Sequence, residues 1–214
     1  MSEGQMGNGI ENAPLAAVVF DVGRVIVEWD LRHLFAKLID DAQELDWFLT
    51  HVVTEEWHFQ HDAGRPLDDM LPERTAQFPA YADLINAYRA RFLETIPGPV
   101  AGTASIIERL AGAGMPLFAI TNFGDEFWAQ FFPTRPELQF FRDIVVSGTE
   151  KLAKPDPAIF HLAQQRFGFA PGRMLFVDDN SANIHSADRL GWQTHLFTDA
   201  DRLEHDLNER GLLA

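Results

Sequence analysis

Five short apolar runs, each followed by polar residues, constrain the fold of this chain more than any other feature. They show no alternation of apolar and polar residues, which is typical of parallel strands covered on both faces. Amphipathic stretches over residues 104–113, 157–167 and 182–190 precede the second, fourth and fifth runs. This order predicts an α/β fold with a doubly wound, Rossmann-like parallel sheet. The runs are Leu15–Phe20, Leu117–Ile120, Ile144–Val146, Met174–Val177 and Thr194–Phe197.

The interval between Asp21 and Gly102 is too long for one crossover between neighbouring strands. It contains no strand-like run, but aromatic, Leu and Ile residues recur in it at helical spacing. We therefore predict a helical cap inserted into the sheet domain. The helical spacing covers residues 29–49, 68–77 and 81–96. The predicted cap spans residues 30–97, and the predicted core spans residues 15–29 and 98–214. We predict that residues 1–14 form a disordered leader.

The composition excludes several other classes of protein. The 214 residues include 17 Lys plus Arg and 32 Asp plus Glu, so the formal net charge of −15 disfavours a broad nucleic-acid-binding surface. The absence of cysteine excludes disulfides, thiolate metal sites and cysteine nucleophiles. The longest purely apolar run, Leu15–Phe20, is too short to cross a membrane, and no basic residue precedes Arg24, which argues against a secretory signal. We expect a cytoplasmic protein that binds neither nucleic acid nor membrane.

Polar side chains of complementary chemistry follow four of the runs. Because the carboxyl ends of parallel strands meet at one edge of a sheet, we expect these groups to lie together. Carboxylates supply a nucleophile and ligands for a hard cation such as Mg²⁺, while a hydroxyl and an ammonium hold an anion. Phosphoryl transfer needs this combination. The groups are Asp21, Thr121–Asn122, Lys154 and Asp178–Asp179–Asn180.

At these positions the sequence resembles the haloacid dehalogenase superfamily of hydrolases. Four motifs occur in the order and at the spacing of that family. The helical insertion follows the first motif, which is where the branch called subfamily IA carries its cap. Each motif alone is weak, whereas the four together are specific. They are Val18-Val-Phe-Asp-Val-Gly23, Ile120-Thr-Asn122, Lys154-Pro-Asp156 and Phe176-Val-Asp-Asp-Asn180.

The resemblance implies a role for each matching residue. Asp21 corresponds to a nucleophile that forms an aspartyl-phosphate and also binds Mg²⁺, the expected cofactor. Thr121 and Asn122 would bind the phosphoryl oxygens, and Lys154 would neutralise charge on the nucleophile and the phosphoryl group. Asp179 would be a further metal ligand. The residues implied to support the metal ligands or the lysine are Asp178, Asn180 and Asn183.

The sequence departs from the family pattern at Gly23. Most phosphatases of the family carry a second aspartate there, which acts as general acid and then as base. Glycine offers Mg²⁺ a backbone carbonyl but cannot transfer a proton, and such transfer contributes about 10²–10⁴-fold to the rate. A branch with glycine at this position includes bacterial phosphatases acting on glucose 1-phosphate, whose leaving group needs less protonation. The resemblance therefore implies a sugar phosphate as substrate.

The predicted cap carries an unusual segment over residues 55–65, in which His58 and His61 stand three positions apart. With Glu55 or Asp62 these histidines could complete a metal site. We favour instead an amphipathic helix that packs its aromatic residues. Because a cap must supply specificity, the segment also offers candidates for substrate binding. These are Trp57, His61 and Arg65, joined by Arg24 beside the first motif, which could instead pair with Glu28.

Our leading hypothesis is a Mg²⁺-dependent phosphatase for a small phosphorylated metabolite, acting through Asp21 as a monomer or homodimer. One alternative is a 2-haloacid dehalogenase, in which Asp21 would displace halide from carbon. The pair Asp178–Asp179 argues against it, because uncompensated carboxylates repel a carboxylate substrate. The other alternative is a catalytically weak binding protein on the same fold. The joint presence of the nucleophile, the lysine and the acidic pair argues against that alternative.

Overall fold

The computed structural model describes residues 14–213 and contains a five-stranded sheet whose neighbouring strands all run parallel. The strand order β3-β2-β1-β4-β5 places β1 at the centre and confirms the predicted doubly wound fold. The chain leaves β1 first toward β3 and later returns to β4 on the other side. Ligands bind at such a reversal, outside the carboxyl ends of the strands. The strands are β1 Ala17–Phe20, β2 Leu117–Thr121, β3 Asp143–Val146, β4 Met174–Asp178 and β5 Gln193–Leu196.

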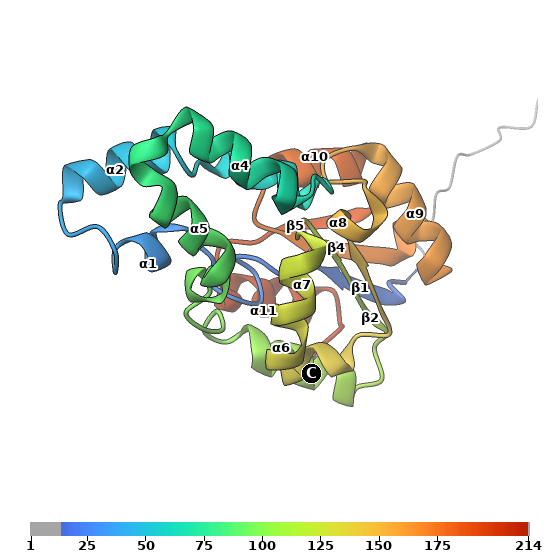
Figure 1. Cartoon of the computed structure of the whole chain (residues 1–214). Coiled ribbons are helices and arrows are strands. Elements are labelled where there is room, and N and C mark those ends of the chain that lie inside the picture. The colour runs from blue at the N-terminus through green and yellow to red at the C-terminus, as the bar shows by residue number, and fades with distance from the viewer. Residues whose placement is uncertain (1–13, 214) are drawn as a thin grey trace, which may run out of the picture.

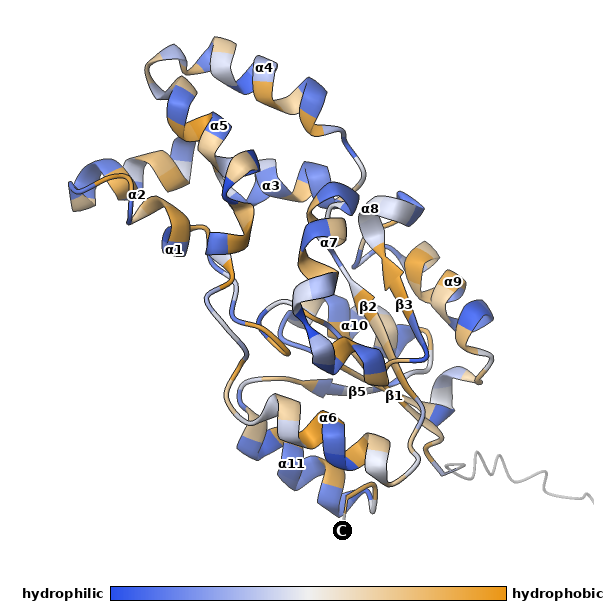
Figure 2. Cartoon of the chain, turned by 60° about the horizontal axis from the view of Figure 1, so that its bottom comes forward, coloured by the Kyte–Doolittle hydropathy of each residue, from blue (hydrophilic) through white to orange (hydrophobic). Residues whose placement is uncertain are grey.

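Two layers of helices cover the sheet, because successive residues of each strand point to opposite faces. Val18 and Phe20 of β1 pack in one apolar cluster with residues of α6 and α11. Ala17 and Val19 pack in a second cluster with residues of α9 and α10. Figure 2 shows α6 and α11 together below the sheet. These helices are α6 Thr103–Gly112, α9 Pro157–Phe167, α10 Ser181–Arg189 and α11 Ala200–Glu209.

Side chains at the starts of these helices explain where they begin. The Asp156 carboxylate accepts a hydrogen bond from the Ala158 amide at the start of α9. The Asn180 side-chain oxygen accepts a hydrogen bond of 2.9 Å from the Ala182 amide at the start of α10. Such caps satisfy amides that have no partner within the helix. The Asn180 cap starts α10 directly after the acidic residues that end β4.

A group of helices lies between β1 and α6 and stands to one side of the sheet (Figure 1). Among the described residues of this interval there is no strand, although Val27 forms isolated bridges with Gly23 and Pro99 where the chain enters and leaves. The domain bounds of 30–97 for the cap remain a prediction. The helices are α1 Arg32–Phe35, α2 Ala42–His51, α3 Glu55–Asp62, α4 Leu67–Gln77 and α5 Ala82–Ala90.

The helix predicted over residues 29–49 is two helices, α1 and α2, rather than one. The break has a local cause at Asp41, whose carboxylate accepts a hydrogen bond from the Glu44 amide, 2.8 Å away. An aspartate in this position starts a new helix. The helices predicted over 68–77 and 81–96 correspond to α4 and to α5 with the 3₁₀ turn Phe92–Thr95.

Two further expectations concern membranes and the amino terminus. Among the described residues, no helix combines the length and the apolar character needed to cross a bilayer. The predicted leader lies, apart from Pro14, outside the described residues.

Candidate active site

Asp21 follows the central strand β1 directly and stands at the middle of the sheet edge. The residue is 8% exposed. Its Oδ1 accepts a hydrogen bond from the Val22 amide at 2.6 Å, and its Oδ2 lies 2.9 Å from the Lys154 ammonium. The carboxylate is therefore held in one orientation by two donors and keeps a face on a pocket.

Lys154 is buried and joins two carboxylates. Its Nζ lies 2.9 Å from Asp21 and 2.7 Å from Asp178. Asn122 anchors the backbone of Lys154, because its side chain donates to the Lys154 carbonyl and accepts from the Lys154 amide, both at 2.9 Å. Burial alone would lower the pKa of Lys154, but Asp178 and Asp21 outweigh it and raise the pKa above its usual value. The lysine is thus a fixed cation at this edge of the sheet.

Asp178 ends β4 and is completely buried. Asn183 of α10 donates to both of its carboxylate oxygens, at 3.0 and 3.1 Å, and the Asn180 amide donates at 2.8 Å. With Lys154 these donors saturate the carboxylate. Asp178 therefore orients Lys154 and the start of α10, while the half-buried Asp179 faces the pocket.

Three carboxylates converge at this point, since oxygen atoms of Asp21, Asp178 and Asp179 lie within 4.8 Å of one another. The pKa of Asp21 is raised from 3.8 to about 7, because burial and the two neighbouring carboxylates together outweigh the opposing effect of Lys154. Burial, followed by Asp178, also raises the pKa of Asp179. Mutual repulsion of this kind is relieved by a divalent cation, and oxygen ligands suit Mg²⁺. The donor set therefore fits a magnesium ion held by Asp21 and Asp179.

Thr121 is the last residue of β2 and is 1% exposed. Its hydroxyl has no hydrogen-bond partner among the described residues. Buried hydroxyls are normally paired. An unpaired hydroxyl at the edge that holds Asp21 fits a site that binds the oxygens of an anionic ligand.

A pocket of about 400 Å³ opens beside these groups, and both the sheet domain and the inserted helices line it. It brings together seven of the residues predicted from the sequence. These are Asp21, Gly23, Arg24, Asn122, Asp179, Asn180 and Asn183.

The predicted substrate contacts Trp57, His61 and Arg65 do not line this pocket. Trp57 packs against Tyr88 with ring centroids 5.0 Å apart. The His61 ring packs on the edge of Phe127, with centroids 4.8 Å apart. Arg65 pairs with Glu73 at 2.5 Å. We therefore do not propose a substrate contact for any of the three.

The helical phase of α3 explains this outcome. One face of an α-helix repeats every three or four residues. Glu55, His58, Phe59 and Asp62 follow that spacing and line the pocket together with Glu56. Trp57 and His61 occupy the other face, and Arg65 lies beyond the end of α3. Trp29, Phe92 and Phe123 also line the pocket, and only their aromatic character marked them in the sequence.

Asp62 attaches α3 to the sheet domain. One of its carboxylate oxygens accepts from the Gly124 amide at 2.8 Å, and the other lies 3.2 Å from His58. Its backbone carbonyl accepts from the Ser147 hydroxyl at 2.5 Å. The inserted helices are thus fixed to the loop after β2 and to Ser147, the first residue after β3, and close the pocket from one side.

The fold and the site define an α/β protein with helices inserted between its first two strands and an acidic pocket at the carboxyl edge of its sheet. A model of the haloacid dehalogenase-like hydrolase family matches residues 30–197. The chain belongs to that family, which confirms the resemblance predicted from the four motifs.

Curated relatives include enzymes with different chemistries. An (S)-2-haloacid dehalogenase of Pseudomonas putida is 33% identical over 95 residues, which are 44% of this chain and 41% of the relative. A sesquiterpene phosphatase of Aspergillus oryzae is 25% identical over 187 residues, which are 86% of this chain and 90% of the relative. The phosphoglycolate phosphatase of Escherichia coli K12 is 27% identical over 126 residues, which are 59% of this chain and 50% of the relative. For the first relatives matched, the chain spans less than half of the relative's length.

Solved structures share the fold at low sequence identity. A HAD-like family hydrolase of Porphyromonas gingivalis superposes with a TM-score of 0.73 at 18% identity, covering 92% of this chain and 98% of that chain. A HAD family enzyme of Bacteroides thetaiotaomicron, in complex with magnesium and inorganic phosphate, superposes with a TM-score of 0.65 at 20% identity. The match covers 89% of this chain and 98% of that chain. These likenesses extend over both the sheet domain and the inserted helices.

Proposed function

We propose that this protein is a Mg²⁺-dependent phosphatase that hydrolyses a small organic phosphate monoester through Asp21. The observation that carries the proposal is the convergence of Asp21, Asp178 and Asp179 within 4.8 Å around a buried lysine, at the mouth of a pocket. The phosphatases among the relatives and the magnesium–phosphate complex of a structural neighbour support it.

The chemistry follows from the positions of the side chains. An Asp21 oxygen attacks phosphorus, and the bond from phosphorus to the leaving oxygen breaks. Water then attacks the phosphorus of the aspartyl-phosphate, which releases inorganic phosphate and restores the carboxylate. Lys154 and the Thr121 hydroxyl stabilise charge on the phosphoryl oxygens. A bound Mg²⁺ would add Lewis-acid stabilisation of the same oxygens.

The test of this proposal is phosphate release from a panel of monoesters, measured with Mg²⁺ and then with EDTA. We expect release that EDTA abolishes and that Asp21→Asn reduces by at least about 10³-fold, because the variant removes the nucleophile. Asp40→Asn is the matched control, since Asp40 is exposed between α1 and α2. Equal activity of Asp21→Asn and the wild type would contradict the proposal.

A 2-haloacid dehalogenase is the second candidate, because the relative at 33% identity carries that name. The three carboxylates disfavour it, since Lys154 alone does not balance them for a carboxylate substrate. Oxygen-18 water separates the two reactions in a single turnover. A phosphatase places the label in phosphate, because water attacks phosphorus. A dehalogenase places it in the Asp21 carboxylate, because water attacks the carbonyl of an ester intermediate. Label in Asp21 with halide release from chloroacetate would establish the second candidate.

A further inference from the structure

Aromatic rings form a continuous wall along the pocket. Trp29 stacks on His58 with ring centroids 4.8 Å apart, and His58 stacks on Phe92 at 5.7 Å. Phe92 meets Phe123 edge to face at 5.8 Å. All four rings line the pocket. We call Trp29, His58, Phe92 and Phe123 the aromatic wall; they come from four separate segments of the chain.

Both ring nitrogens of His58, which lies within this wall, are already paired within the protein. The Nδ1 atom of His58 lies 2.6 Å from the Tyr88 hydroxyl, and its Nε2 lies 3.2 Å from Asp62. Asp62 accepts a further hydrogen bond from the Gly124 amide at 2.8 Å. A ligand hydroxyl that sought a partner in His58 or Asp62 would have to break such a buried pair, which is costly. An apolar ring would only displace water from apolar surface, which is favourable.

Charge around the aromatic wall disfavours a second anionic group on the ligand. Arg24 lines the pocket, but its guanidinium lies 2.5 Å from the Glu55 carboxylate and 4.8 Å from the centre of the Trp29 ring. Glu56 and Asp62 line the same pocket. A carboxylate on the leaving group would therefore meet two further acids and an arginine that is already neutralised.

The glycine at position 23 is compatible with the same kind of leaving group. Without a proton donor there, a leaving oxygen must depart with little protonation. A phenolic hydroxyl has a pKa of about 10, well below that of an ordinary alcohol, and is a correspondingly better leaving group. The aromatic wall therefore points to an aromatic leaving group, and the missing acid requires that this group be a good one.

We infer that the substrate is a phosphate monoester of an uncharged aromatic alcohol, whose ring packs along the aromatic wall while its phosphoryl group faces Asp21. This inference rests on the proposed phosphatase function and departs from the sugar phosphate implied by the sequence. Phe59 extends the apolar lining at the solvent side, since it lines the pocket and is 41% exposed.

Binding of two phosphonates tests the aromatic wall without catalysis. Phenylphosphonate and methylphosphonate differ only in the ring, and neither can be hydrolysed as an ester. With Mg²⁺ present, we expect calorimetry to show phenylphosphonate binding at least about tenfold more tightly, because the ring buries apolar surface. Equal affinities would overturn the inference.

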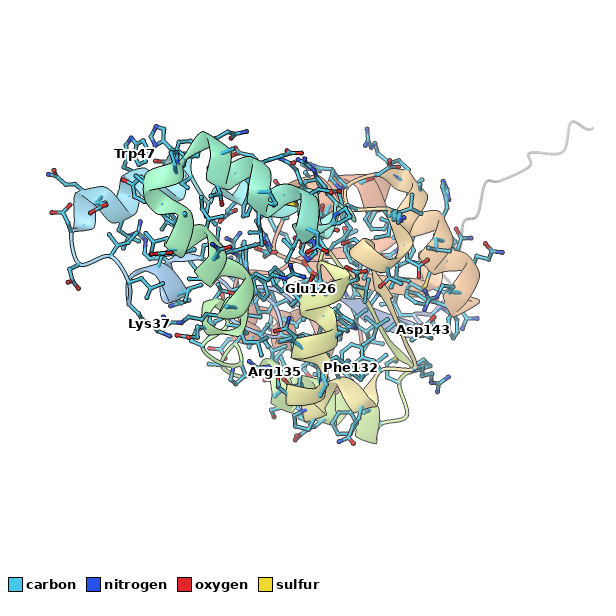
Figure 3. The ribbon with its side chains drawn as sticks, in the orientation of Figure 1. Lys37, Trp47, Glu126, Phe132, Arg135 and Asp143 are labelled. Carbon is cyan, nitrogen blue, oxygen red and sulfur yellow. The ribbon has the colours of Figure 1, made fainter. Side chains whose placement is uncertain are left out.

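The variant Phe59→Ala should reduce the difference in affinity between phenylphosphonate and methylphosphonate. Phe132→Ala is its matched control, because Phe132 is also a surface phenylalanine and is 43% exposed (Figure 3). It lies in the 3₁₀ turn after helix α7 Asp125–Phe131 and does not line the pocket. We expect the control to retain the full difference. Retention of the full difference by Phe59→Ala as well would contradict the placement of the ring.

Steady-state kinetics with three phosphate esters provides the second test of this inference. We expect kcat/KM for phenyl phosphate to exceed that for glucose 1-phosphate and for phosphoglycolate by at least about tenfold, since these three leaving groups differ in ring character, hydroxyl content and charge. Preference for either of the latter compounds would overturn the inference and leave the phosphatase proposal standing. No phosphate release from any of the three, or from acetyl phosphate, would overturn both.

Discussion

At the residue scale, the environment of Gly23 decides how this site differs from a site with two aspartates. A Cβ atom built on Gly23 meets no heavy atom within 4 Å, and the glycine does not need a positive φ. The position could therefore hold a side chain beside Asp21 without steric strain. The missing proton donor is a property of this one residue and not of the surrounding backbone.

The substitution Gly23→Asp should accelerate hydrolysis of alkyl phosphates, because it restores a group that can protonate the leaving oxygen. We expect kcat for such poor leaving groups to rise about 10²-fold and kcat for phenyl phosphate to change much less. Steady-state kinetics over a series of leaving groups measures the effect. Gly98→Asp is the control, since a Cβ there is equally unhindered. An unchanged dependence on the leaving group would contradict the account of Gly23.

Individual residues also show why one part of the site could be predicted from the sequence and another part could not. Asp21, Lys154 and Asp179 follow strands, and parallel strands bring their ends together whatever the details of packing. The pocket residues His58 and Phe92 could not be predicted in this way. Their position depends on how α3 and its neighbours rotate against the sheet domain, and a rotation by half a turn exchanges the faces of a helix.

At the scale of elements, the contact between α3 and the loop after β2 holds the pocket closed on one side. Gly124 packs against His61 so closely that a Cβ would lie 2.1 Å from the ring. The ring itself has little freedom, since His61 is 1% exposed and its Nδ1 lies 2.9 Å from the Arg65 carbonyl. Helix α3 and the loop after β2 therefore meet at a position where a side chain in place of glycine would clash.

The substitution Gly124→Ala should separate the two elements or strain them. We expect a loss of about 1–3 kcal/mol in the free energy of unfolding, typical of overpacking, with a rise in KM for the substrate. Chemical denaturation and steady-state kinetics measure these effects. Gly112→Ala, at the end of α6, is the matched control, because its Cβ meets no atom within 4 Å. A Gly124→Ala variant as stable as this control would refute the close contact.

At the scale of the whole molecule, the acidic balance of −15 and the binding of a phosphate are compatible. The net charge disfavours extended polyanions, which contact a broad surface. A single phosphoryl group meets only the local field. There the buried Lys154 supplies positive charge inside an acidic surface, and a cation held by Asp21 and Asp179 would add to it. Part of the acidic excess would thus serve to hold that cation.

The stability of the whole molecule should depend on pH through Asp21. Burial raises the folded-state pKa of Asp21 to about 7, against 3.8 for the ordinary carboxyl. The folded protein therefore holds a proton that the unfolded chain has lost, and the metal-free protein becomes less stable as the pH rises through this window. Thermal unfolding of the metal-free wild type, relative to Asp21→Asn, should show this decline between pH 4 and pH 7.

Magnesium should reverse that trend, because it binds the ionised carboxylates. We expect Mg²⁺ to raise the melting temperature of the wild type more above pH 7 than below it, and to have little effect on Asp21→Asn. A magnesium effect that does not vary with pH would show that Asp21 is not a ligand with a raised pKa.

The central claim is that Asp21 is phosphorylated during turnover, and acid quenching followed by peptide mass spectrometry tests it most directly. Because Gly23 cannot activate water for the second step, the aspartyl-phosphate should accumulate when wild-type protein is mixed with Mg²⁺ and acetyl phosphate or phenyl phosphate. The account predicts the mass of one phosphoryl group on the peptide that contains Asp21, and less of it in Gly23→Asp. Rapid phosphate release with no modified peptide, undiminished in Asp21→Asn, would contradict it.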